Sequence, residues 1–394
     1  MAIQKLVEGV FSVGVVDWDR RLFDELIPLP DGTSYNSYIV IGEEKTALVD
    51  TVDPEKSKEL INNLKRLKVE KLDYIIANHA EQDHSGTIPD LLEIYPEAKV
   101  VTNPKCKGFL VDLLHIPDDK FIEVENGETL SLGGRTFEFI YTPWVHWPET
   151  MSTYLIEDKI LFSCDFFGSH RATSSLFVQD EYKVIEDAKR YYAEIMMPFR
   201  NHIRKNIEKI SSKEIKYIAP SHGPVYNNPK IIINAYNEWI SEDVKNQILI
   251  PYVSMHGSTD VIVMELVEIF TESGIEVMPF NLTKTDVGEL AMALVDAATL
   301  IIGTPTVLAG PHPFVVYAAY LVNALRPKLK IASIVGSLGW GGKTVDILTT
   351  IMKNLKLDFV EPLLIKGLPK SDDKEKIKEF ANIIIEKHKN MFKL

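Results

Sequence analysis

The chain has 394 residues, a length that fits two or three domains better than one. Its composition, 45% hydrophobic and 25% charged, is that of a globular protein and excludes a mostly disordered chain. The net charge of −13 disfavours binding to nucleic-acid phosphates, which clustered Lys and Arg side chains hold in known complexes.

The first 240 or so residues predict a mixture of short strands and helices. Runs rich in β-branched and aromatic residues, separated by Gly-rich or acidic turns, predict strands at 35–41, 46–50, 74–77, 99–102, 136–142 and 154–156. Helical periodicity is found at 55–67 and 204–210. We expect an αββα sandwich whose polar residues lie in loops at strand ends.

The pattern changes at Gln247, after which strands and helices alternate regularly. The predicted strands are 248–253, 276–280, 299–303, 330–336 and 359–365. The predicted helices are 259–272, 286–294, 314–325, 344–355 and 373–387. This alternation is typical of a doubly wound, five-stranded parallel sheet. The short charged segment 239–246 suggests a boundary, which divides the chain into domains 1–245 and 246–394.

Two further absences narrow the class of protein. No apolar run reaches the roughly 18 residues of a membrane span, and the N-terminal segment has no export signature, so a cytoplasmic location is expected. The only cysteines are Cys106 and Cys164, too few for an all-cysteine iron–sulfur cluster or a disulfide framework. They are most simply two buried thiols.

Four candidate metal ligands follow the strand predicted at 74–77: His79, Glu81, Asp83 and His84. In an extended segment, residues two apart point the same way, so the first three share a face. Such a patch of carboxylates and imidazoles is costly unless a cation neutralises it. A solvated, acidic helix N-terminus with incidental histidines is the alternative.

Three more candidates occupy similar positions farther along the chain. His146 lies in a Trp- and Pro-rich loop, Asp165 follows an apolar strand, and His222 precedes a Gly-Pro turn. Taken singly, His146 could be a satisfied core residue and Asp165 a cap or half of a buried ion pair. Their matching contexts, each after a predicted strand, favour one shared metal site.

The order His79-x-Glu81-x-Asp83-His84, His146, Asp165, His222 resembles that of the metallo-β-lactamase superfamily. One position departs from that pattern, because Glu81 stands where the second histidine is usual. An added carboxylate makes the site harder and suits iron better than zinc. Seven ligands can hold two metals if Asp165 bridges them, and mixed His and carboxylate ligation is typical of non-haem iron that handles oxygen or nitric oxide.

Three loops in the second half predict a flavin-binding edge. They follow the first, third and fourth predicted strands, at whose carboxyl ends doubly wound sheets bind ligands. The first resembles the phosphate loop of flavodoxins, with hydroxyls and backbone N–H groups at a helix N-terminus. Trp340 could stack on a flavin ring or simply pack, and nothing orients His256 and His312. The candidate residues are Ser254, Met255, His256, Gly257, Ser258, Thr259, Thr304, Pro305, Thr306, Ser337, Leu338, Gly339, Trp340 and Gly341.

A lactamase-type domain with this ligand order, followed by a flavodoxin-like domain, resembles the flavodiiron proteins, also called A-type flavoproteins. The stretches 32–38 and 144–148 also look like that family. The resemblance implies one iron held by His79, Glu81, His146 and Asp165, and a second held by Asp83, His84, His222 and the shared Asp165. It implies FMN in the three C-terminal loops and reduction of dioxygen to water, nitric oxide to nitrous oxide, or both. It further implies a head-to-tail homodimer or a dimer of dimers, in which the flavin of one chain meets the irons of the other.

Two departures from that family qualify the expectation. Many members have a histidine near position 24, where this chain has Asp24 and Glu25. No rubredoxin or flavin reductase sequence follows the flavodoxin-like part, so electrons are expected from a separate donor, a rubredoxin or a reduced deazaflavin coenzyme. Tyr191 and Tyr192 are candidate proton donors, although adjacent tyrosines in an apolar helix more often pack.

Two other functions remain open from the sequence. One is a zinc hydrolase with a flavodoxin-like regulatory domain, in which the metals would activate water. The other is a flavin-dependent electron carrier with a structural metal, although structural sites are closed and usually have four ligands. Metal analysis and gas reduction separate these possibilities.

Overall fold

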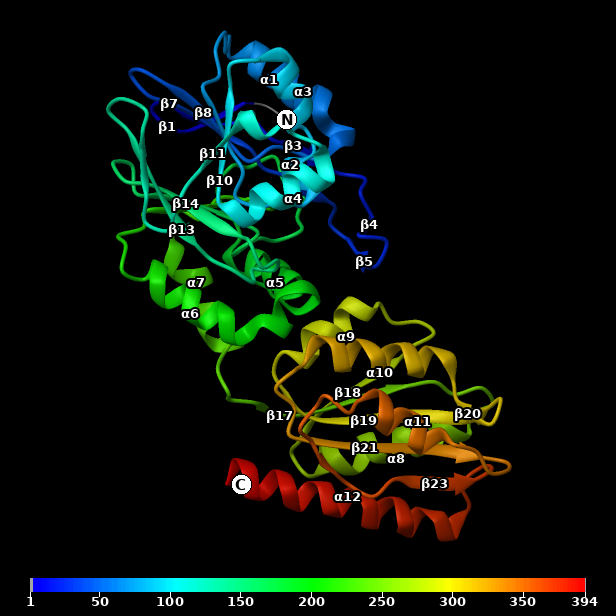
Figure 1. Ribbon diagram of the computed structural model, residues 1–394. Helices are drawn as coiled ribbons and strands as arrows, with labels where there is room; N and C mark the ends of the chain where they lie inside the picture. Colours follow the sequence, from blue (N-terminus) through cyan, green and yellow to red (C-terminus); the bar gives the residue numbers. More distant parts are fainter. Residues whose placement is uncertain (1–2, 394) are drawn as a thin grey trace. The chain divides into compact units, whose positions relative to one another are not determined.

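Two compact units make up the part of the chain that the computed structural model describes, residues 3–393 (Figure 1). The N-terminal unit takes the chain up to Tyr192 together with Phe199–Ile240. The C-terminal unit takes Ala193–Pro198 and the chain from Ser241 onward.

Two sheets form the centre of the N-terminal unit. The first has the order β1 (Gln4–Val7), β2 (Val10–Ser12), β7 (Tyr38–Ile41), β8 (Thr46–Val49), β9 (Tyr74–Ile76), β10 (Lys99–Thr102) and β11 (Phe121–Glu123). The second has the order β12 (Thr129–Ser131), β13 (Thr136–Tyr141), β14 (Met151–Leu155), β15 (Ile160–Cys164) and β16 (Tyr217–Pro220). Strands β8 to β11 run parallel to one another, and so do β15 and β16, so their carboxyl ends open on common edges.

Alternation along the strands explains why these sheets stack. In β7, Tyr38 and Val40 pack between the two sheets with Phe137 and Phe162, whereas Ile39 faces the helices on the other side. The helices of the unit are α1 (Ser57–Arg66), α2 (Gln82–Ser85), α3 (Ile88–Ile94), α4 (Pro104–Leu114), α5 (Glu181–Tyr191), α6 (Arg200–Ile210) and α7 (Pro229–Trp239). Apolar residues of α1, α3 and α4 cover the first sheet, and α5 to α7 lie on the side of the second sheet (Figure 1). The predicted αββα sandwich is therefore confirmed.

Short hairpins extend from one end of this sandwich. Strand β3 (Val15–Asp17) pairs with β6 (Thr33–Tyr35), and β4 (Leu22–Phe23) pairs with β5 (Ile27–Pro28). Asp24 and Glu25 form the turn of the second hairpin, both with positive φ.

The C-terminal unit is a parallel sheet with helices on both faces. Its order is β18 (Glu276–Asn281), β17 (Lys245–Tyr252), β19 (Ala297–Val307), β21 (Ile331–Leu338), and then β22 (Asp358–Phe359) and β23 (Leu363–Lys366). A short β20 (Gly310–Pro311) folds back on β19. Helices α9 (Val287–Leu294), α10 (Pro313–Leu325) and α11 (Thr344–Ile351) lie on one face, and α8 (Ser258–Glu272) and α12 (Ser371–Phe392) on the other (Figure 1). The predicted flavodoxin-like fold is confirmed.

Two predicted strands are broken in the structure. Within 35–41, one strand ends at Tyr35 and another begins at Tyr38. Asn36 interrupts them because it hydrogen-bonds to the loop at the end of β16. Its backbone N–H donates to Ser221 O at 2.8 Å and its side chain donates to Pro220 O at 2.8 Å. The segment 359–365 is interrupted around Pro362, which has no N–H to donate to the sheet. Across residues 3–393, no helix combines the length and apolarity that a membrane crossing requires.

Candidate functional site: a metal centre and a ligand-binding sheet edge

Four of the candidate ligands come from the segment that leaves β9. His79 and Glu81 lie in the loop itself, and Asp83 and His84 lie on the short helix α2 that follows. Asp50 anchors the start of this loop, because its carboxylate accepts the backbone N–H and the side-chain amide of Asn78, both at 2.9 Å.

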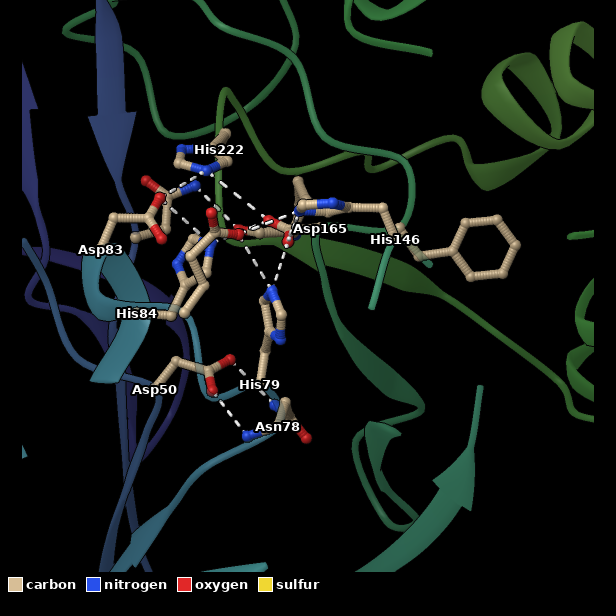
Figure 2. A network of polar contacts seen from close by, with 12 residues as sticks. Asp50, Asn78, His79, Asp83, His84, His146, Asp165 and His222 are labelled. Carbon is tan, nitrogen blue, oxygen red and sulfur yellow. Dashed lines mark hydrogen bonds and ion pairs between the residues drawn. The ribbon is translucent and has the colours of Figure 1, made fainter. Parts of the chain in front are cut away.

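The other three candidates come from the second sheet. His146 lies between β13 and β14, Asp165 directly follows β15, and His222 follows β16. Because β15 and β16 are parallel neighbours, Asp165 and His222 leave the same edge of the sheet. All seven residues therefore meet where the ends of the two stacked sheets face each other, and Figure 2 shows the histidines converging on Asp165.

The seven side chains form two groups, each able to offer a metal ion ligand atoms within 4.8 Å of one another. In the first group, Glu81 Oε2 lies 3.1 Å from His79 Nε2 and 2.9 Å from His146 Nε2. In the second, Asp83 Oδ2 lies 3.3 Å from His84 Nε2 and 3.2 Å from His222 Nε2. Each group thus pairs one carboxylate with two imidazoles.

Asp165 lies between the two groups and turns one oxygen toward each. Its Oδ2 lies 3.5 Å from His79 Nε2 and 3.6 Å from His146 Nε2. Its Oδ1 lies 2.8 Å from His84 Nε2 and 3.6 Å from His222 Nε2. Asp165 can therefore offer one oxygen atom to each group.

The donor atoms fit metal ions better than they fit one another. Both carboxylate oxygens of Asp83 and of Asp165, and Nε2 of His84 and His222, are buried without an aligned hydrogen bond among the described residues. Buried polar atoms are rarely left in this way. The donor set of imidazole nitrogens and carboxylate oxygens is one that iron accepts. The residues present therefore fit a pair of iron ions.

The buried imidazoles and carboxylates of the centre shift one another's pKa values strongly because little water screens their charges. Burial lowers the pKa of His79, but the carboxylates of Glu149, Glu81 and Asp165 outweigh it and hold that pKa well above its ordinary value. Burial raises the pKa of Asp165, but His84, His79 and His222 outweigh it and hold that pKa well below the usual range. The buried carboxylates thus create a site that favours positive charge.

Residues that the sequence did not single out orient the histidines. His222 Nδ1 lies 2.6 Å from Ser34 O, and because a carbonyl only accepts, this nitrogen carries the proton and leaves Nε2 free for a metal. Glu149 plays the corresponding part for His79, at 2.6 Å from its Nδ1. Ser34 lies in the stretch 32–38 that resembles the flavodiiron proteins, whereas the only sequence signal for Glu149 was its place three residues after His146.

Aromatic residues border the centre unevenly. The Trp147 ring meets His79 edge-on at 5.0 Å, whereas Trp144 is exposed and stacks on Phe199. Tyr191 lies 4.7 Å from the ring of His170 and 5.7 Å from that of His222. Tyr192 packs instead on Tyr236 and Trp239. Of the two tyrosines, only Tyr191 borders the ligands.

A cavity of about 250 Å³ leads to the centre, and Asp24 helps to line it. Glu81 and Asp83 form part of its wall, together with Arg20, Phe23, Asp53, Gln82, Leu113 and Trp147. Burial and the nearby charges of Glu81 and Asp83 raise the pKa of Asp24 to about 6. Glu25 is exposed and is not part of the lining.

The candidate flavin-binding residues lie together at one edge of the C-terminal sheet. Strands β17, β19 and β21 are adjacent, so the loops at their carboxyl ends are adjacent as well. Thr304 and Pro305 pair in register with Gly336 and Ser337. Thr259 Oγ1 lies 3.4 Å from Ser337 Oγ, which links the first loop to the third.

Open backbone at this edge leaves room for a ligand. Gly257 has φ +89° at the start of the 15-residue helix α8, and a Cβ placed on Gly257, Gly339 or Gly341 would meet nothing within 4 Å. Met255, His256 and Trp340 are exposed here. A helix N-terminus, hydroxyl groups and an exposed aromatic ring fit a phosphate and a flat ring system. His312 instead caps α10, because its Nδ1 accepts the N–H of Phe314 at 3.2 Å.

Comparisons with known proteins agree with this architecture. A family model described as "ODP family beta lactamase" matches residues 33–223. A nitric oxide reductase from Moorella thermoacetica is 35% identical over 96% of this chain and 97% of its own. A coenzyme F420H(2) oxidase from Methanothermobacter marburgensis is 31% identical over 94% and 95%.

Solved structures are similar along the whole chain. The rubredoxin oxygen:oxidoreductase of Desulfovibrio gigas has a TM-score of 0.95 at 30% identity and covers 99% of both chains. The flavodiiron protein of Giardia intestinalis has a TM-score of 0.91 at 29% identity and covers 98% of both chains.

Proposed function

Because the chain belongs to the flavodiiron protein family, we propose that it is an oxidoreductase that reduces dioxygen to water, nitric oxide to nitrous oxide, or both. The observation that carries the proposal is the pair of carboxylate and imidazole groups with Asp165 between them. The two alternative functions explain the structure less well. A zinc hydrolase would not require the flavin-binding edge of the C-terminal unit, and a structural metal site would not require a cavity beside its ligands.

The proposed ligands divide as the two groups do. His79, Glu81, His146 and one oxygen of Asp165 would hold the first iron. The second would be held by Asp83, His84, His222 and the other oxygen of Asp165. When bound, iron exchanges single electrons and binds small gases, while FMN in the loops of the C-terminal unit stores two electrons and passes them on singly.

Side chains around the metal groups would limit the access of water and supply protons for the reaction. Ring contacts from Trp147 and the wall formed by Phe23 limit water around the ligands. Reduction of either gas consumes protons, and the carboxyl group of Asp24 lies at the cavity wall beside Glu81 and Asp83, where it can take up and pass on a proton. Tyr191, whose pKa burial raises well above the ordinary value, stays protonated beside His222 and is the better candidate of the two tyrosines.

We infer that electrons enter from a separate donor, a rubredoxin or a reduced deazaflavin coenzyme. The names of the two relatives from Desulfovibrio gigas and Methanothermobacter marburgensis support these two classes for this chain. We also propose a cytoplasmic, head-to-tail homodimer, alone or as a dimer of dimers. His146 and Trp147 line a shallow, mostly apolar depression on the N-terminal unit, which suits the approach of a partner chain's flavin.

One experiment tests the proposal directly. The protein is purified, its iron, zinc and flavin are counted per chain, and the reduced form is mixed anaerobically with dioxygen or nitric oxide in a stopped-flow instrument. About two irons and one FMN per chain, with rapid reoxidation by at least one gas, is the expected result. A colourless protein containing zinc, or a flavoprotein that reduces neither gas, would overturn it.

A further inference from the structure

The two metal groups have the same ligands but different surroundings. Each has two imidazoles, one carboxylate of its own and one oxygen of Asp165. Identical donors would give two irons of similar reduction potential. A difference between them therefore comes from their surroundings: Glu81 and His146 are partly exposed whereas the second group is buried, and different residues lie behind the ligands.

Glu149 creates such a difference. It lies just before β14, is 3% exposed, and its Oε1 is 2.6 Å from His79 Nδ1 and 3.2 Å from the backbone N of Ala80. The backbone of Glu149 is itself held, because Asn103 donates to its carbonyl oxygen at 2.6 Å. Its second oxygen, Oε2, has no hydrogen-bond partner among the described residues. The charge of this carboxylate is therefore directed at His79.

In the second group no carboxylate hydrogen-bonds to Nδ1 of either histidine among the described residues, although the buried carboxylate of Asp50 interacts with His84 through charge. His222 Nδ1 faces the neutral carbonyl of Ser34, and His84 Nδ1 has no hydrogen-bond partner within residues 3–393. A carboxylate behind a ligating imidazole fixes the ring and makes it a stronger donor. A neutral carbonyl fixes the ring without adding charge.

We propose that Glu149 is a positioning residue that holds Nε2 of His79 toward the metal and gives the iron of the first group the lower reduction potential of the pair. This inference rests on the proposed function, since it requires iron at both groups. When the reduced pair is oxidised, each iron gives up one electron. The iron held by His79, Glu81 and His146 gives up its electron first.

The test is an anaerobic redox titration of the full-length, iron- and FMN-loaded protein, with the half-oxidised iron pair followed by EPR spectroscopy. In Glu149→Gln, which keeps the shape and removes the charge, we expect the lower iron potential to rise and the upper one to stay. A tenfold fall in the stability of the half-oxidised pair corresponds to about 59 mV for a one-electron step. Iron affinity measured by chelator competition should fall about 10-fold or more.

Two variants make the result decisive. Glu149→Asp keeps the charge, so it should retain the wild-type separation of potentials better than Glu149→Gln, even if its iron affinity falls. Glu93→Gln removes a charge from an exposed position of α3 and should change neither quantity. If Glu149→Gln moves the upper potential, moves both equally, or only lowers the melting temperature, the inference is wrong. Absence of two irons from the wild-type protein would instead refute the proposed function.

Discussion

Asp50 accepts two hydrogen bonds from Asn78, one from its backbone N–H and one from its side-chain amide, each at 2.9 Å. Neither residue belongs to a metal group, yet the next residue in the chain is His79. Asn78 also accepts from the hydroxyl of Thr153 on β14, at 2.7 Å, so it joins the two stacked sheets at the metal centre. The loop that carries four candidate ligands is thus fixed by a buried pair that contacts no metal.

Replacing Asn78 with Ala should therefore weaken iron binding without removing a ligand. The change removes the side-chain amide that donates to the buried Asp50 carboxylate and leaves only the backbone N–H, at a cost of about 1–3 kcal/mol. Iron per chain after gel filtration and the melting temperature of the full-length protein are the measurements. Asn62→Ala, at an exposed position of α1, is the matched control. Full iron content in Asn78→Ala would show that the ligand loop does not depend on the side chain of Asn78 for iron binding.

Removal of the shared carboxylate should affect both metals, whereas removal of a terminal ligand should affect one. We expect Asp165→Ala to bind well below one iron per chain and His222→Ala to bind about one, both with normal flavin content. Both should lose gas reduction. Iron and flavin are counted on the same sample, with the exposed His115→Ala as control. Two irons in Asp165→Ala would disprove the bridging position.

The flavin-binding loop can be tested separately from the metals. Replacing both Ser258 and Thr259 with Ala removes two hydroxyls at the start of α8, and each lost hydrogen bond to a phosphate costs about 1.5–3 kcal/mol. The dissociation constant for FMN should rise at least tenfold, as measured by quenching of free flavin fluorescence, with iron content unchanged. Thr349→Ala, on α11, is a suitable control because its hydroxyl bonds only to carbonyls of its own helix. Unchanged FMN affinity in the double variant would place the phosphate elsewhere.

A buried histidine in the C-terminal unit should make its stability depend on pH. His388 on α12 has ring nitrogens 2.7 Å from Thr299 Oγ1 and 2.7 Å from Asn246 Oδ1, and burial lowers its pKa to about 4. The unfolded chain therefore binds a proton more readily than the folded one. The contribution is complete above the unfolded pKa of about 6.5 and is lost as the pH falls toward 4, up to about 3 kcal/mol in all.

This dependence is measured as the pH profile of thermal unfolding between pH 7.5 and 4.5. The melting temperature of the wild-type protein should fall more steeply below pH 6.5 than that of His388→Gln, which has no titrating ring. His115→Gln, at an exposed position of the N-terminal unit, should follow the wild type. Parallel profiles for the wild type and His388→Gln would rule out this origin.

The local pattern of apolar and polar residues was enough to predict the fold class and the seven candidate ligands. Strands and helices alternate in hydrophobicity with different periods, and residues that follow strand ends stand out when they are acidic or imidazole side chains in otherwise apolar surroundings. The breaks at Asn36 and Pro362 were not foreseen, the first because its cause lies 184 residues away in sequence, at Pro220.

The sequence by itself thus determined which donor atoms this protein can offer to metals and on which strand ends they stand. Only the tertiary structure decided that Asp165 turns one oxygen to each group and that Asp24 rather than Glu25 borders the cavity. It also decided that Glu149 hydrogen-bonds to Nδ1 of His79, whereas no carboxylate of residues 3–393 does so to His84 or His222. These are contacts between residues from different sheets and hairpins. Their distances depend on how the two sheets stack, which no local run of residues encodes.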